Sequence, residues 1–154
     1  MNFHQQLRTQ YQRFKQSQQT LSQKLQAEAK MLERYLRQAL SLDGCYRKSI
    51  NDEMPTEPYL RLSDMAILSE NAELPSLRFK LIVVLDEGED VYPKEEINQL
   101  FELGYLQPDR MVMRFLPPTA ANFPFNLGDD ANNKFEPFAV AFQQCLLHNL
   151  RERK

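Results

Sequence analysis

The chain has 154 residues, of which 42% are hydrophobic and 26% are charged, and its formal net charge at pH 7 is −2. This length suffices for one sizeable core but not for two ordinary domains. No apolar run approaches the roughly 18 to 20 residues that a membrane span needs. The first fifteen residues are interrupted throughout by Gln and Arg and lack the apolar centre of a secretory signal. We therefore expect a cytoplasmic protein that does not enter a membrane.

The segment from His4 to Leu42 predicts one continuous helix, because it contains no Gly or Pro. In a heptad with position a at His4 and position d at Leu7, nine of the twelve a and d residues are apolar. Such a seam is typical of helices that pair in coiled coils. The polar seam residues would define register rather than add stability. The seam residues that we expect to contact a partner are Leu7, Tyr11, Phe14, Leu21, Leu25, Leu32 and Tyr35.

The apolar stripe of this helix widens from Ala29 onward, where Ala29, Met31 and Leu36 join the seam. A narrow seam suits one partner helix, whereas a wide stripe suits the body of a domain. We therefore expect the first half of the helix to project and the second half to pack on its own domain.

Charge is distributed unevenly along the chain. Residues 1–48 carry nine basic and three acidic residues, a net charge of +6, and the remainder carries ten and eighteen, a net charge of −8. Opposite signs indicate attraction between the arm and the body, within or between subunits, or an arm that binds a polyanion. The candidate polyanion contacts, all outside the a and d positions, are Arg8, Arg13, Lys15, Lys24, Lys30, Arg34 and Arg37.

These cations could follow a nucleic-acid backbone. They are spread along the helix rather than clustered, however, and no nucleic-acid-binding motif is present. A solvated helix face is therefore the simpler interpretation, and nucleic-acid contact remains an alternative.

The pattern predicts a basic arm over residues 1–50, a polar linker broken by two prolines over 51–58, and an acidic domain over 59–154. Gly44 is the expected stop of the arm helix, because glycine suits a left-handed helix cap. We expect a short strand at Tyr59–Leu62 and a short helix at Ser63–Glu73.

The rest of the domain alternates strands and helices. Leu77–Leu85 and Arg110–Leu116 are the two clearest strands, because apolar residues alternate with polar ones or run on continuously. Between them, Pro93 followed by Glu95 and Glu96 predicts the start of a helix that ends at Gly104. The two strands could pair in parallel through this helix or pair antiparallel.

The last part of the domain is predicted as a loop followed by a helix. Thr119–Asn133 reads as a long loop whose aromatic residues dock on the domain. Lys134–Leu150 is a final helix, because its apolar residues recur every three or four positions. The expected fold class is thus α+β, with a long coiled-coil-like N-terminal helix, a small sheet-and-helix domain and a C-terminal helix.

The sequence indicates no catalytic, cofactor-binding or metal-binding residues. His4 and His148 form no metal-binding pair, Cys45 and Cys145 match no metal or redox spacing, and the four glycines build no phosphate-binding loop. An acidic turn over residues 86–90 follows a buried strand, where carboxylates can bind Mg²⁺, and it leaves a metal-dependent enzyme as a less favoured alternative.

We therefore expect a non-enzymatic oligomerising adaptor or accessory protein whose arm pairs with a second copy, as a homodimer, or with a helix of a partner protein. The e and g positions of the heptad offer no opposite charges to a parallel homodimer. An antiparallel arrangement, or packing on the acidic body of a second subunit, agrees better with the charge asymmetry.

Overall fold

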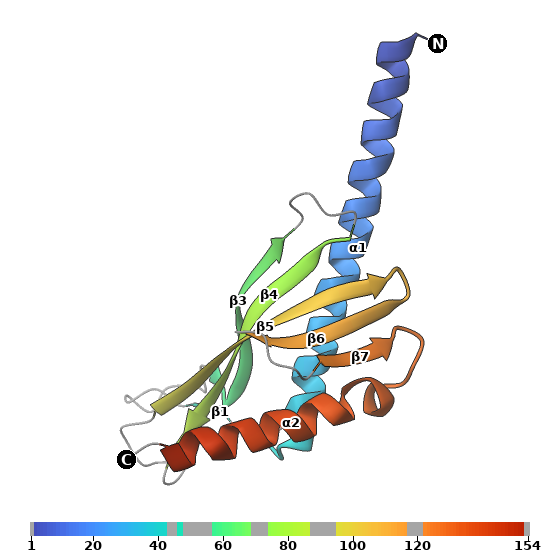
Figure 1. The fold of residues 1–154 in the computed structure, drawn as a ribbon. Helices are drawn as coiled ribbons and strands as arrows, with labels where there is room; N and C mark the ends of the chain where they lie inside the picture. The colour runs from blue at the N-terminus through green and yellow to red at the C-terminus, as the bar shows by residue number, and fades with distance from the viewer. Residues whose placement is uncertain are drawn as a thin grey trace.

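The fold consists of a long helix, a five-stranded antiparallel sheet and a second helix (Figure 1). The computed structural model describes residues 2–42, 46–47, 57–68, 74–86, 95–116 and 122–152. In chain order the elements are α1 (Phe3–Ala39), β1 (Tyr46–Arg47), β2 (Glu57–Pro58), β3 (Leu60–Leu68), β4 (Ser76–Leu85), β5 (Glu95–Gln107), β6 (Arg110–Leu116), β7 (Asn122–Asn126) and α2 (Ala131–Glu152). This arrangement confirms the predicted α+β class.

The strands β3 to β7 lie side by side in chain order, and each pairs antiparallel with the next. The two clearest predicted strands are confirmed as β4 and β6, and both run antiparallel to the strand between them. β1 and β2 form a separate two-stranded pair. Their pairing places the last two residues of the predicted 51–58 linker in β2, and residues 51–56 lie outside the described part of the chain.

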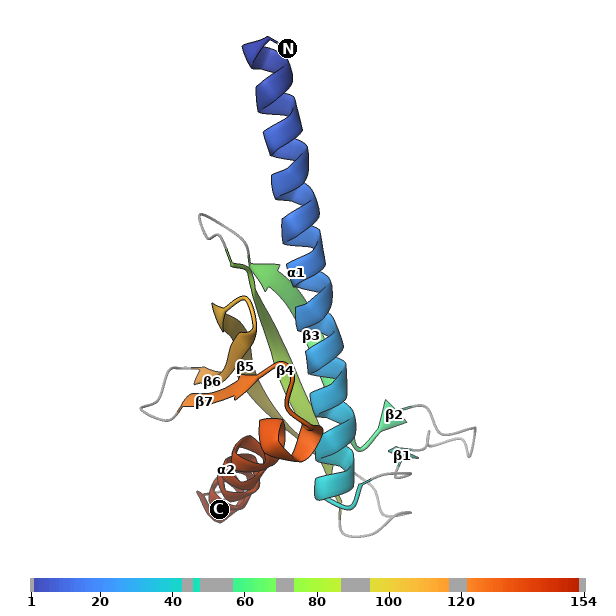
Figure 2. The same ribbon diagram turned by 90° about the vertical axis from the view of Figure 1, so that its right-hand side faces the viewer.

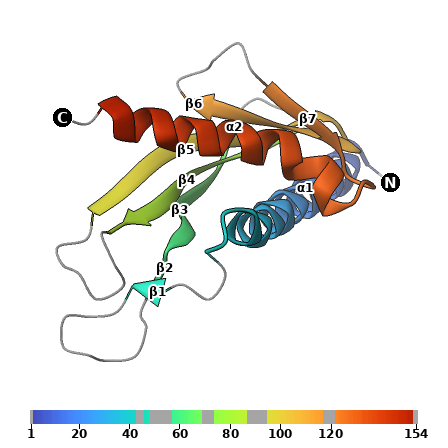
Figure 3. The ribbon, with the colours of Figure 1, turned by 90° about the horizontal axis from the view of Figure 1, so that it is seen from below.

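Both helices cover the same face of the sheet, and the core lies between them and the strands. Phe101 of β5 is at its centre: the centroid of its ring lies 5.2 Å from that of Phe138 and 5.8 Å from that of Phe142, both on α2. Leu25 and Leu32 of α1 belong to the same buried cluster. Figure 3 shows α2 running across the strands with the end of α1 beside it.

The opposite face of the sheet carries charged side chains. Glu102 lies between Arg78, at 3.3 Å, and Arg114, at 3.7 Å, on the neighbouring strands. Gly104 makes room for this arrangement, because a Cβ atom there would lie 3.2 Å from Nη1 of Arg114. Cross-strand ion pairs thus stabilise this part of the face, which also carries the buried apolar residues Ile82, Val84 and Val112.

The segment predicted as a helix from Pro93 to Gly104 is instead strand β5 from Glu95 onward, and residues before Glu95 are not described. Its buried residues Ile97, Phe101 and Leu103 face the helices with the two-residue period of a strand, while Leu100 points to the other face and is exposed. The helix prediction was wrong because the spacing of Ile97 and Phe101 satisfies both periods, and Leu100 completes a helical spacing although it lies on the other face of the strand.

Two further predictions in the domain were wrong. Within the helix predicted at Ser63–Glu73, the residues as far as Leu68 belong to strand β3. The pairing of β3 is irregular between Ser63 and Ala66, where Asp64 has a positive φ of 55°. The expected loop at Thr119–Asn133 contains β7 and the first turn of α2. The side chain of Asp130 accepts a hydrogen bond from the backbone N–H of Asn133, so α2 begins three residues before its predicted start.

Helix α1 ends at Ala39, before the predicted stop at Gly44, which lies outside the described residues. Ser41 adopts a left-handed conformation with φ of 57°. The N–H of Leu42 donates to the carbonyl of Arg37 at 2.7 Å, and the N–H of Ser41 donates to that of Gln38 at 3.1 Å. This is a Schellman motif in which serine takes the position that glycine usually occupies.

Candidate interaction surface

The first half of α1 extends beyond the sheet and stands clear of the domain (Figures 1 and 2). With 37 residues and about 1.5 Å per residue, the helix is about 55 Å long. Its start is fixed by a capping box, in which the Asn2 side chain accepts from the Gln5 N–H and the Gln5 side chain accepts from the Asn2 N–H. The described residues contain no helix long and apolar enough to span a membrane.

Four large apolar side chains lie exposed on this projecting half. The exposed fractions are 73% for Phe3, 52% for Leu7, 59% for Tyr11 and 54% for Phe14. Their spacings of four, four and three residues place them on one face of the helix. We call these four residues the exposed stripe.

The exposed stripe lies on the same face of α1 that packs on the domain further along. Leu25, Ala29, Leu32 and Leu36 are fully buried and continue the three- and four-residue spacing. At about 100° per residue, the mean directions of the exposed and buried sets coincide around the helix axis. The helix therefore carries one apolar face, of which the second half is covered by its own chain and the first half is open.

The predicted partner-binding seam therefore divides in two. Three of its residues are exposed on the projecting half of α1, namely Leu7, Tyr11 and Phe14. Leu21 is half-buried where α1 meets the domain. Leu25 and Leu32 are core residues, and the ring of Tyr35 packs against that of Phe135 at 5.9 Å. For these last three residues the prediction of partner contact was wrong, because the sheet and α2 already occupy their side of the helix.

A buried ion pair holds α1 to the start of α2. Nζ of Lys134 lies 3.0 and 3.1 Å from the two carboxylate oxygens of Glu28, and the two side chains are only 4% and 12% exposed. Close by, the hydroxyl of Tyr105 donates to the carbonyl of Leu21 at 2.9 Å. Burial and the nearby charge of Glu28 raise the pKa of Tyr105 to about 12. These contacts mark the point at which α1 leaves the domain.

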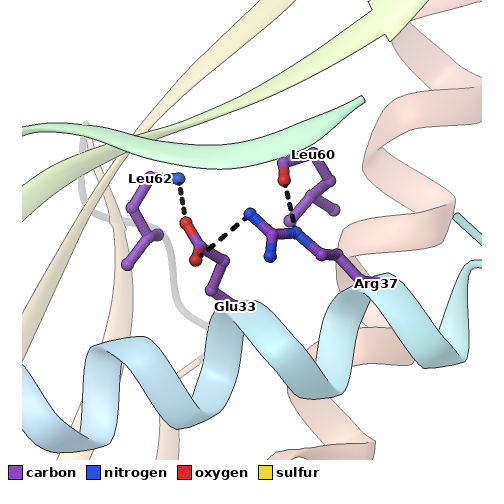
Figure 4. A network of polar contacts seen from close by, with 4 residues as sticks. All are labelled: Glu33, Arg37, Leu60 and Leu62. Carbon is purple, nitrogen blue, oxygen red and sulfur yellow. Dashed lines mark hydrogen bonds and ion pairs between the residues drawn. The ribbon is translucent and has the colours of Figure 1, made fainter. Parts of the chain in front are cut away.

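The other end of the covered half is joined to the edge of the sheet (Figure 4). A carboxylate oxygen of Glu33 accepts the backbone N–H of Leu62 at 2.6 Å, and Nε of Arg37 donates to the carbonyl of Leu60 at 2.8 Å. Glu33 and Arg37 also form an ion pair at 3.2 Å. Since β3 is an edge strand, these side chains satisfy backbone groups that would otherwise face solvent.

The candidate polyanion contacts are exposed on α1 with one exception. Arg37 is bound to the edge of β3, as described above. Nζ of Lys15 lies 5.1 Å from the centre of the Tyr11 ring, at the side of the exposed stripe. The remaining exposed cations are Arg8, Arg13, Lys24, Lys30 and Arg34.

Sequence reasoning missed a groove at the opposite end of the molecule. It has a volume of about 400 Å³ and lies between the end of α1 and the second half of α2, lined mainly by Leu40, Leu85, Leu146, Leu147 and Leu150. Leu150 continues the three- and four-residue apolar spacing of α2, Leu147 lies beside it, and both are exposed. Leu147, an apolar residue outside that spacing, is the signal that the sequence offered.

The remaining candidate chemistry is sparse. Asp86 accepts a hydrogen bond from the hydroxyl of Tyr59, and residues 87–90 of the predicted acidic turn lie outside the described part. His4 and His148 are exposed at distant points, and burial raises the pKa of the Cys145 thiol. In the described ranges, no group of three His, Cys, Asp or Glu side chains is placed to hold a metal ion.

Comparisons of the chain with protein families, with curated proteins and with solved structures find no match.

Proposed function

We propose that this protein is a non-enzymatic adaptor whose projecting arm binds a helix of another chain, either a different protein or a second copy in an oligomer. The observation that carries the proposal is the exposed stripe, four large apolar side chains on a part of α1 that its own domain leaves uncovered. Helix-in-groove and coiled-coil recognition both use apolar residues at this spacing.

The energetics support association through this face. Full burial of a large apolar side chain contributes about 1.5 to 3 kcal/mol, and each residue of the exposed stripe has more than half of its surface still available. Burial of each of these side chains by a partner would therefore contribute on the order of 1 kcal/mol to the binding free energy. The domain gains nothing from these side chains in the isolated chain, which distinguishes them from the buried residues on the same face.

The test is titration of the protein with a designed helical peptide that carries a leucine seam, followed by fluorescence anisotropy. We expect Leu7→Ala/Phe14→Ala to weaken binding about 30-fold, because two anchors lose roughly 1 kcal/mol each. The matched control is Gln12→Ala/Gln16→Ala, which introduces two alanines on the opposite face of the same helix. Helicity and thermal stability should be unchanged in both variants.

Equal binding by wild type and by Leu7→Ala/Phe14→Ala would refute the proposal. So would a lack of binding by the wild type combined with a monomeric protein at every concentration in sedimentation velocity, because neither kind of helix would then occupy the arm.

A further inference from the structure

We infer that the helix bound by the arm belongs to a different protein and carries acidic residues along one flank of its apolar seam. The inference rests on the proposed function and identifies the chemistry of the partner. It follows from the charges beside the exposed stripe and from the position of the domain on α1.

The projecting half of α1 carries positive charge only. Between Asn2 and Ala27 there is no Asp or Glu, whereas Arg8, Arg13, Lys15 and Lys24 are all exposed. Arg8 and Lys15 occupy successive e positions of the heptad, so they lie on one flank of the exposed stripe. Beside the exposed stripe the opposite flank carries the uncharged Gln10 and Ser17, and its next position, Lys24, lies beyond the stripe. A complementary helix therefore has carboxylates on the flank that meets Arg8 and Lys15.

The two acidic side chains of α1 cannot supply this complement in a second copy. Glu28 is bound to Lys134 inside the domain, and Glu33 is bound to Arg37 and to the backbone of β3. A paired second arm would consequently offer cations alone to the cations of the first.

The domain also obstructs parallel pairing of two arms. In a parallel pair the second helix lies about 10 Å away along the whole apolar face. From Leu25 to Leu36 this face is filled by the sheet and by α2, all four apolar residues there being fully buried. A second copy in parallel register would place its α1 inside the first domain.

Antiparallel pairing avoids this overlap but brings like charges together. If Tyr11 of one arm packs against Phe14 of the other, Arg8 of each copy lies beside Lys15 of the other, twice in the symmetric pair. Each such contact is repulsive, and no acidic residue of either arm lies near enough to offset it. A separate acidic helix has neither disadvantage.

The length of the partner helix follows from the same geometry. The open part of the apolar face runs from Phe3 to about Leu21, where Tyr105 binds the backbone of α1. The helix axis from Phe3 to Leu21 is about 27 Å long, so the arm accommodates a partner helix of about 18 residues. Its end would meet the turn between β5 and β6.

The experiment compares two designed 18-residue peptides that share a leucine seam and carry either Glu or Lys at the e and g positions. We expect the full-length protein to bind the Glu peptide about tenfold more tightly than the Lys peptide at low salt, because two attractions replace two repulsions. The ratio of the two affinities should decrease as the salt concentration is raised, because salt screens both the attractions and the repulsions.

Charge-reversal variants locate the effect on the protein. Lys15→Glu should remove the preference and Arg8→Glu/Lys15→Glu should invert it. Lys30→Glu is the matched control: it reverses a lysine on the same helix, but at a position opposite the apolar face and beyond the exposed stripe. It should leave the tenfold ratio unchanged.

Three outcomes would overturn the inference, and they separate it from the proposed function. Equal binding of both peptides would remove the acidic partner while leaving the arm as a helix-binding site. Micromolar self-association that Leu7→Ala/Phe14→Ala abolishes would identify a second copy as the occupant. A failure to bind either peptide, by a monomeric protein, would refute the proposed function as well.

Discussion

Replacing Lys134 with methionine should strongly destabilise the fold, because it leaves the carboxylate of Glu28 buried without its cation. The lysine side chain is 4% exposed and Glu28 is 12% exposed, so water screens the lost interaction only weakly. Removal of one partner of a buried ion pair costs about 3 to 5 kcal/mol. For a chain of this length, that loss lowers the Tm by roughly 6 to 20 °C.

Urea unfolding followed by circular dichroism at 222 nm measures this free energy of unfolding directly. The double variant Glu28→Leu/Lys134→Met should recover most of the loss, because no charge is then left buried. The single variants and the double variant form a thermodynamic cycle, in which the coupling between the two sites should be several kcal/mol.

Two results would refute this reasoning. One is a free energy of unfolding for Lys134→Met within about 1 kcal/mol of that of the wild type, which would show that water solvates the Glu28 carboxylate as well as Lys134 does. A double variant whose loss equals the sum of the two single losses would show that Glu28 and Lys134 do not act as one unit.

Three further predictions concern other parts of the domain. Phe101→Ala removes the ring at the centre of the aromatic core and should cost about 3 to 5 kcal/mol in urea unfolding, whereas a loss below 1 kcal/mol would contradict its central position. Because the folded pKa of Tyr105 is raised to about 12 above its ordinary value of 10.0, its contribution to stability is complete below pH 10 and is lost as the pH rises towards 12. Tyr105→Phe should therefore reduce the alkaline loss of stability, and Glu28→Leu should lower the pKa of Tyr105 in an ultraviolet titration of tyrosinate absorbance. Glu33→Ala removes the carboxylate that accepts the N–H of Leu62, and it should lower the free energy of unfolding by about 1.5 to 3 kcal/mol. Amide hydrogen exchange at Leu62 should become faster, and unchanged exchange there would contradict the contact in Figure 4.

The parts of the fold that the sequence predicted are those in which a single periodicity dominates. Arg110–Leu116 is a strand with the predicted bounds, and α2 follows its three- and four-residue apolar spacing. β5 could not be recognised because Ile97, Leu100 and Phe101 agree with a helix, and only the neighbouring strands show that Leu100 lies on the other face. β7 was missed because Pro124 indicates a loop, although an edge strand tolerates proline.

The sequence predicted the apolar face of α1 but not the length over which its own domain leaves that face open. The heptad pattern is the same before and after Leu21, so the sequence could not show where the domain begins to cover the helix. The widening of the stripe suggested Ala29, whereas burial begins at Leu25. The groove between the helix ends depends on how α1 and α2 meet, and no local pattern encodes that angle.

The exposed stripe has a consequence for how this chain can change over time. Its four residues are covalently continuous with the core helix, yet their side chains contribute no packing to the domain. Under the proposed function, substitutions there would alter what the arm binds with little effect on the free energy of unfolding, provided that the helix is preserved. The two halves of α1 would then be constrained separately, the buried half by stability and the projecting half by the partner that it binds.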